Sequence, residues 1–451
     1  MKYFAILKDS LKEALDSKVL LVLLILSTLI IVFVATVSFK PLSAERTMGQ
    51  FFPVGNEKMS LPLVVALNSH KPQKVGGEAL MHTMNALGQF RLVKVELLSG
   101  EADAPESEYE LTISRQAWQA GNQQKAVDDN TEAKKAIRSI FEDAIELDYL
   151  RVGDPERIEP ADPDKKGAPT LYRVKVQGTP RMLRIWAAEP SLFFGTVPVG
   201  GLSAPLGYQI YILTSFVLSI GTWIAVLTGV VITSFFIPNM LRKGTVDLLL
   251  VKPIHRWVLL FYKYIGGLTF IFLSTAFAVG GIWLVLGLRT GLWANGTLLL
   301  VLTITFFFAI LYAVSTFVGV VTRSTVTAIM ATIIAWFVFY LVGSAHQVFH
   351  NQHLVEQEME KNGRPIPEDS RWGDGKAATV INVLHAISPR TADLNYLNDL
   401  IVCTDFMTGN LGDMKKFDTS KRNWWECLLV SSIWISVFLG LAMVWFTLKD
   451  Y

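Results

Sequence analysis

Cysteine is nearly absent from this chain, and charge is scarce. Cys403 and Cys427 are the two cysteines among 451 residues, which is too few for a disulfide framework. Because Cys427 begins an apolar stretch, we expect no bond between the two. Charged residues make up 18% of the chain and its formal net charge is +2. This balance excludes the basic field that is typical of nucleic-acid-binding proteins.

The motifs of self-contained catalysis are also missing. The chain has no Gly-x-x-x-x-Gly-Lys-[Ser/Thr] phosphate loop, so we expect that it does not hydrolyse ATP by itself. It has neither a His-Glu-x-x-His zinc-protease motif nor a Gly-x-Ser-x-Gly nucleophile elbow. The sequence therefore predicts a protein without catalytic residues, cofactor or resident metal.

Apolar residues, by contrast, make up 51% of the chain. Six stretches without Asp, Glu, Lys or Arg are long enough to cross a bilayer, which takes about 20 helical residues. They lie at 19–39, 206–237, 264–288, within 290–322, at 324–345 and at 427–448. The stretch at 19–39 is too long for a signal-peptide core and lacks a cleavage site, so it predicts a retained anchor. The predicted fold class is an α-helical polytopic membrane protein with six transmembrane helices.

The distribution of Lys and Arg predicts the orientation, because short cytoplasmic loops carry an excess of both. The cytoplasmic side is expected to hold the lysines and arginines of the amino-terminal segment, of the loop after the second stretch and of the later turns, namely Lys2, Lys8, Lys12, Lys18, Arg242, Lys243, Lys252, Arg256, Arg323 and Lys449. The short loop on the opposite side has Arg289 alone. We therefore predict a bacterial inner-membrane protein with both termini in the cytoplasm.

The remaining segments predict an amphipathic interfacial helix and two outer regions. Residues 1–18 have helical apolar spacing and are either an interfacial helix or a plain cytoplasmic extension of the first span. Residues 40–205 are long enough for an extracytoplasmic domain. Alternation and helical spacing predict an α+β domain there, with strands at 109–114, 172–177 and 182–186, a hairpin turn at 178–180, helices at 131–144 and near 77–87, and a loop at 154–169.

The carboxyl-terminal half completes this division. Residues 206–345 hold the second to fifth spans with a cytoplasmic loop at 238–263, and residues 426–451 hold the sixth span and a short tail. The second outer region, 346–425, contains helical patterns at 355–361, 380–384 and 392–402.

None of the six stretches carries an ionisable residue of the kind that ion-coupled carriers place inside the membrane. Energy for transport must then come from outside the membrane domain, or the protein transports nothing actively. We expect the aromatic runs 306–308 and 336–340 to face lipid or neighbouring helices, and Gly229, Gly280, Gly281 and Gly287 to permit close helix contact.

Histidines in the second outer region leave two weaker alternatives. His350 and His353, with Glu356 one turn further on, have the spacing of a metal pair, although a solvated helix explains them as well. An intramembrane enzyme acting on lipid head groups through His346, His350 and His353 is a further possibility.

The loop at 239–263 is the most informative segment. It combines a helix start, a leucine triplet, a proline stop and flanking cations, and these could enter a groove of a cytoplasmic partner. Alternatively, the cations are ordinary positive-inside residues and the leucines pack on the next span. The candidate coupling residues are Arg242, Lys243, Gly244, Thr245, Asp247, Leu248, Leu249, Leu250, Pro253, Arg256 and Lys263.

This loop resembles the first cytoplasmic loop of type-2 ATP-binding-cassette (ABC) transporter permeases, the family that includes copper-processing and gliding-motility permeases. The matching residues are Gly244, Thr245, Leu248, Leu249, Leu250, Pro253, Ile254, Arg256 and Lys263. Asp247 stands where the family usually has Glu, and Asn239 and Arg242 stand where it has acidic residues.

The resemblance implies a permease subunit, for export or lipid handling, that works as a dimer. Its partners would be a separate cytoplasmic ABC ATPase, a second permease protomer and membrane lipid, with no nucleic acid. The alternative is a membrane-anchored extracytoplasmic binding or assembly protein without transport activity.

Overall fold

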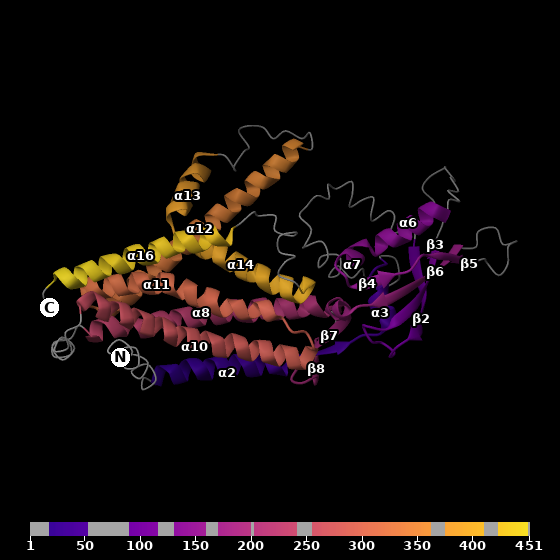
Figure 1. Ribbon diagram of the computed structural model, residues 1–451, viewed down its shortest axis with the longest axis horizontal. Coiled ribbons are helices and arrows are strands. Elements are labelled where there is room, and N and C mark those ends of the chain that lie inside the picture. Colours follow the sequence, from indigo (N-terminus) through magenta and orange to yellow (C-terminus); the bar gives the residue numbers. More distant parts are fainter. Residues whose placement is uncertain are drawn as a thin grey trace.

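The structure of this chain, a computed structural model, describes residues 18–52, 90–115, 130–158, 170–199, 203–240, 255–361, 375–409 and 423–449. A bundle of long helices forms one end of the elongated molecule, and a sheet with short helices forms the other (Figure 1). The predicted interfacial helix at 1–18, the helix near 77–87 and most of the loop at 239–263 lie outside the described residues.

The long apolar stretches all form helices. The bundle consists of α2 (Lys18–Thr36), α8 (Leu206–Met240), α10 (Arg256–Thr290), α11 (Leu300–Thr322), α12 (Thr325–Lys361) and α16 (Trp424–Leu448). Within the described residues, five of them are long and apolar enough to cross a membrane, the α11 span including the short 3₁₀ helix η2 (Asn295–Leu299) before it. The sixth, α2, has a shorter described apolar part, Leu21–Thr36, which packs against α10.

The core of the bundle is centred on α11, whose residues from Phe307 to Thr316 are all buried. Close contact with neighbouring helices depends on glycine at some of the predicted positions. A Cβ at Gly229 would lie 2.8 Å from Ile271 Cδ1, and one at Gly281 would overlap the side chain of Ile31. A Cβ at Gly280 would meet nothing within 4 Å, so this glycine is not needed for helix contact.

The domain between α2 and α8, called the outer domain after its predicted position outside the cytoplasm, is α+β, as its alternating segments predict. An antiparallel five-stranded sheet has the order β2 (Phe90–Ser99), β3 (Glu108–Arg115), β6 (Thr170–Gly178) and β4 (Leu150–Val152), with β5 (Glu156–Ile158) also paired to β6. Alternate residues of β3 and β6 point inward, among them the fully buried Leu111 and Val174. Helix α6 (Asn130–Ile140) places Ile137 in the same core, and α7 (Glu142–Glu146) follows it.

The predicted strand at 182–186 and the hairpin before it are wrong. Residues Pro180–Arg184 form a 3₁₀ helix, η1, in which the N–H of Arg181 donates to the Thr179 hydroxyl. Both edges of β6 are already paired, to β3 on one side and to β4 and β5 on the other, so no edge remains for a returning strand. The apolar side chains of Met182 and Trp186 are buried in the domain core instead. The predicted loop at 154–169 also contains a short strand, β5.

A second, smaller sheet joins the outer domain to the bundle. Strand β1 (Ser38–Pro41) follows α2 directly and pairs with β7 (Ala187–Leu192), which also pairs with β8 (Val197–Pro198) and β9 (Ala204–Pro205). The chain passes from α2 into β1 and returns from β9 into α8, so this one sheet contains both connections between these two helices and the domain. The side chain of Gln209 on α8 donates to the carbonyls of Ala188 and Ala204 and holds the junction together.

A further contact ties the outer domain to the region after α14 (Thr391–Cys403). Arg184 Nε donates to the backbone carbonyl of Asp405, 3.3 Å away, and the Tyr149 hydroxyl donates to the carbonyl of Met407. The Asp405 carboxylate accepts hydrogen bonds from the backbone N–H and the hydroxyl of Thr297. Burial raises the pKa of this carboxyl group above its ordinary value. The hydrogen bonds from Thr297 act in the opposite direction but do not cancel this rise.

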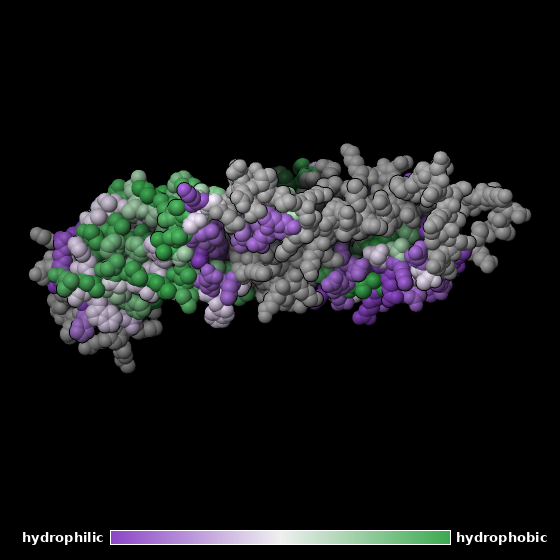
Figure 2. All heavy atoms as spheres, turned by 90° about the horizontal axis from the view of Figure 1, so that it is seen from above, coloured by the Kyte–Doolittle hydropathy of each residue, from purple (hydrophilic) through white to green (hydrophobic). Residues whose placement is uncertain are grey.

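Surface character divides the molecule in the same way. Figure 2 shows hydrophobic surface over the helical half and hydrophilic surface over the half that carries the five-stranded sheet. Large apolar side chains on several helices are exposed, including Leu29, Phe216 and Phe337. Exposed apolar surface of this extent is typical of a membrane-embedded helix bundle.

Candidate functional site

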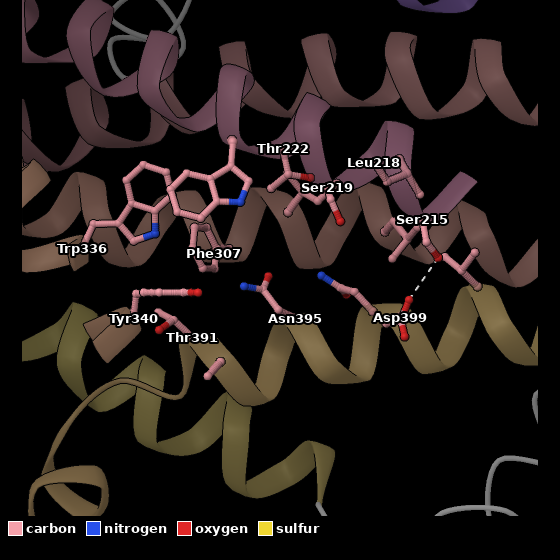
Figure 3. A pocket seen from close by; sticks show the side chains of 16 residues that line it. Ser215, Leu218, Ser219, Thr222, Phe307, Trp336, Tyr340, Thr391, Asn395 and Asp399 are labelled. Atoms are coloured by element: carbon pink, nitrogen blue, oxygen red, sulfur yellow. Dashed lines mark hydrogen bonds between the residues drawn. The ribbon is translucent and has the colours of Figure 1, made fainter. Parts of the chain in front are cut away.

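A cavity of about 170 Å³ lies among α8, α11, α12 and α14. It borders the half of α8 that is nearer the outer domain, between Ser215 and Trp223. In Figure 3, polar side chains of α8 and α14 face each other across the cavity, and aromatic rings gather at one end.

Helix α8 lines the cavity with one helical stripe. Ser215, Ser219 and Thr222 recur at the spacing of a single helix face, together with Leu218 and Trp223. The three hydroxyl groups give this otherwise apolar helix one polar side. The side chains can bind a polar ligand because hydroxyl groups both donate and accept hydrogen bonds.

Helix α14 supplies the opposite wall through Thr391, Asn395, Asn398 and Asp399, again on one face. The Asp399 carboxylate accepts hydrogen bonds from the Ser215 hydroxyl and the Tyr211 hydroxyl, each 3.0 Å away. Asp399 and Asn395 are exposed at the mouth of the cavity. The buried Oδ1 atom of Asn398 has no hydrogen-bond partner among the described residues.

Aromatic rings close the other end of the cavity. The ring centroids of Trp223 and Trp336 are 4.3 Å apart, and Tyr340 meets Trp223 edge-on at 6.0 Å. Phe307 packs against Trp336 at 6.4 Å. The sequence-based expectation that the aromatic runs only face lipid or other helices is therefore incomplete, since three of these rings line the cavity.

A helical hairpin positions α14. Helix α13 (Lys376–Ile387) and α14 are joined by a turn at Ser388, Pro389 and Arg390. Arg390 N–H donates to Ser431 Oγ at 3.2 Å, and Trp434 Nε1 donates to the carbonyl of Ile387. Ser431 and Trp434 lie about 10 and 15 Å along α16 from its first residue, at about 1.5 Å per residue. The turn therefore reaches well down the side of a predicted span.

Charged residues hold this turn in place. Arg390, which is 7% exposed, donates from Nη2 to Glu426 at 2.8 Å and from Nη1 to the His385 ring. His385 Nε2 lies 3.3 Å from an oxygen of Asp393. The six predicted spans lack buried charge by sequence, but the hairpin brings the buried Arg390 and Asp393 against the helix bundle. Counting ionisable residues in the spans alone could not find this cluster.

The histidines of α12 contact each other and α13. His346 stacks on His385, with ring centroids 3.6 Å apart, whereas His353 lies 2.8 Å from the Gln357 side chain. Among the described residues, no group of three or more His, Cys, Asp or Glu side chains is arranged to hold a metal ion. His346 also stacks on His350 of the same helix, with ring centroids 5.8 Å apart, and its Nδ1 lies 2.9 Å from Asn382 Oδ1 of α13.

The predicted coupling loop is described only at its ends. Met240 ends α8 and His255 caps α10, while the candidate residues between them, Arg242, Lys243, Gly244, Thr245, Asp247, Leu248, Leu249, Leu250 and Pro253, lie outside the described residues. Arg256 donates from Nη1 to the backbone carbonyl of Lys449, 3.1 Å away. This bond places the start of α10 beside the end of α16, at the same end of the bundle. Lys263 lies on α10.

The cavity residues were missed by sequence reasoning, although a signal was present. Ser215, Ser219 and Thr222 repeat on one face of an apolar stretch, and Asn395 and Asp399 repeat one turn apart in a predicted helix. What the sequence could not show is that these two faces oppose each other, because that depends on the hairpin.

Comparison with known proteins identifies a family. A family described as "ABC-2 family transporter protein" matches residues 4–451, which is nearly the whole chain. No curated protein matches the chain. Long apolar helices, an α+β outer domain and a family match of this extent lead to one assignment: the chain belongs to the ABC-2 transporter family, as a multi-pass, non-catalytic permease subunit.

Proposed function

We propose that this chain is the membrane-spanning subunit of an export or lipid-handling ABC transporter, of the type that includes copper-processing and gliding-motility permeases. A separate ATPase would drive it through the loop at 239–263, and two permease protomers would act together. The subunit would lie in a bacterial inner membrane with both termini in the cytoplasm.

The observation that carries this proposal is the family match, which spans both the bundle and the loop. The position of the loop supports it. The loop connects α8 to α10 at the end of the bundle where Arg256 bonds to the carbonyl of Lys449. An ATPase docked there would act directly on α8, which lines the cavity. Motion of α8 would then change the access of a ligand to the cavity.

Coupling by population shift sets a condition on the substrate. A ligand moves a conformational equilibrium only if it binds the two states with different affinity. The cavity meets this condition if α8 and α14 separate or approach during the cycle, because its polar walls belong to different helices.

Association with the ATPase tests the proposal. The proposal predicts that an ATPase with Walker motifs and no membrane span is encoded beside this chain, and that ATPase is the partner to use. We expect the tagged wild-type chain to retain the ATPase in detergent. Leu249→Asp should bind the ATPase at least about tenfold more weakly, because a charge on an apolar docking face costs about 1.4 kcal/mol or more of binding free energy.

Leu97→Asp is the matched control, because Leu97 is an exposed leucine of β2 in the outer domain. It should retain the ATPase fully. Equal retention by the Leu249→Asp and wild-type chains would contradict the proposal and favour a membrane-anchored binding or assembly protein.

A further inference from the structure

We infer that the cavity between α8 and α14 binds an organic cation with an apolar or aromatic body. This inference rests on the proposed transport function and assigns a substrate class to the cavity. It is carried by the charge of the cavity wall, by the free acceptor capacity of that wall and by the rings at its far end.

The charge of the wall has one sign. Among the sixteen described residues that line the cavity, Asp399 is the one ionisable acid and none is Lys, Arg or His. Asp399 is exposed at the mouth of the cavity, where its carboxylate can meet a ligand. The hydroxyl groups of Tyr211 and Ser215 satisfy part of the carboxylate but do not neutralise it. A cationic ligand at the mouth would neutralise it.

Acceptor atoms outnumber the donors that reach them. A carboxylate has about four lone-pair sites, and the two hydroxyl groups occupy two of those of Asp399. A ligand that brings N–H donors or positive charge fits the remaining lone pairs of Asp399 better than a ligand that brings acceptors.

The far end of the cavity suits an apolar or flat group. Trp223 and Trp336 lie 4.3 Å apart with an angle of 36° between their planes, and Tyr340 stands edge-on beside them. The faces of tryptophan rings attract cations and stack on flat groups. The wall therefore changes from anionic to aromatic along one axis, as a cationic amphiphile would require (Figure 3).

An anionic lipid head group is the competing ligand class, and the wall disfavours it. A phosphate would face Asp399 with no cationic partner among the described lining residues. The buried cation nearest in sequence to α14, Arg390, is already bonded to Glu426 and His385.

Binding of benzyltrimethylammonium to the purified full chain in lipid nanodiscs tests the inference. Neopentylbenzene is its neutral isostere and phenylmethanesulfonate is an anion with the same ring. We expect saturable binding of the cation, at least about tenfold weaker competition by the neutral isostere, and none by the anion. Equal competition by all three compounds, preference for the anion, or no saturable binding would overturn the inference.

Variants locate the site. Asp399→Asn should weaken cation binding at least about tenfold, whereas Asp399→Glu should retain it. Trp223→Leu should weaken binding of the cation as well. Glu142→Gln, an exposed residue of α7, is the control and should change nothing. Unchanged cation binding by the folded Asp399→Asn protein would refute the site. If that variant does not fold, the preference of the wild-type chain among the three compounds tests the inferred cation class.

The outcome is independent of the ATPase. Binding is measured on the permease subunit alone, so failure of cation binding with normal ATPase retention would refute the substrate class and leave the proposed function in place. Cation binding without ATPase retention would contradict the proposed function and leave the cation site in place.

Discussion

At the scale of single residues, the account depends on a few polar groups in apolar surroundings. Asp399 faces the cavity, and Arg390 anchors the hairpin that carries Asp399. The two acids near the turn differ in role. Glu426 is largely exposed and pairs with Arg390, whereas Asp393 is mostly buried and pairs with His385. Removing a cation from such a cluster leaves buried acceptors without a partner, which costs more than the pair itself contributes.

Arg390→Met should therefore destabilise the protein. We expect the free energy of unfolding to fall by about 2–3 kcal/mol. This is less than the about 3–5 kcal/mol that is usual for a broken buried pair, because Glu426 is partly hydrated. Thermal unfolding of the purified chain in detergent measures the effect as a lower Tm.

The control is Arg138→Met, which removes an exposed ion pair to Asp154 with an N–O distance of 3.4 Å. Such surface pairs contribute about 0–1 kcal/mol. If the two substitutions lowered the Tm equally, Arg390 would not anchor the turn.

At the scale of elements, helix contacts and the hairpin decide where the polar faces meet. The long helices follow from apolar runs, and the strands at 109–114 and 172–177 follow from alternation. The segment at 182–186 also alternates but forms the end of a 3₁₀ helix, because β6 has partners on both edges. The local pattern therefore predicts most helices and strands. Where the pattern is ambiguous, the available sheet partners determine whether a segment forms a strand.

Adjacent glycines of α10 give a sharp test of helix contact. Gly281 faces Ile31 of α2 without room for a Cβ, whereas a Cβ at Gly280 would meet nothing within 4 Å. We expect Gly281→Val to lower the free energy of unfolding by about 1–3 kcal/mol through overpacking. Gly280→Val should change it little.

Thermal unfolding in the same detergent compares these two variants. Because the substitution is identical and the positions are neighbours, differences in helix propensity cancel. Similar Tm values would show that α2 does not pack against α10 as the structure has it.

At the scale of the whole molecule, the chain joins an outer domain, a helix bundle and an end that bears the loop. One small sheet links the outer domain to α2 and α8, and Arg184 links it to the segment after α14. Two of the four cavity helices, α8 and α14, are thus attached to the outer domain, and α8 also leads to the loop. The sequence predicts the spans and the outer domain, but the cavity arises from four helices spread over residues 206–403, and no local pattern shows their arrangement.

The central claim is that an ATPase at the 239–263 loop changes the state of the cavity. Labelling of Ser219→Cys on the exposed cavity wall, in a Cys403→Ser background and in the complex with the ATPase, tests it most directly. We predict that a soluble maleimide labels this position several-fold faster or slower when ATP is added, and that Leu249→Asp abolishes the change. An equal labelling rate with and without ATP in the intact complex would contradict the account.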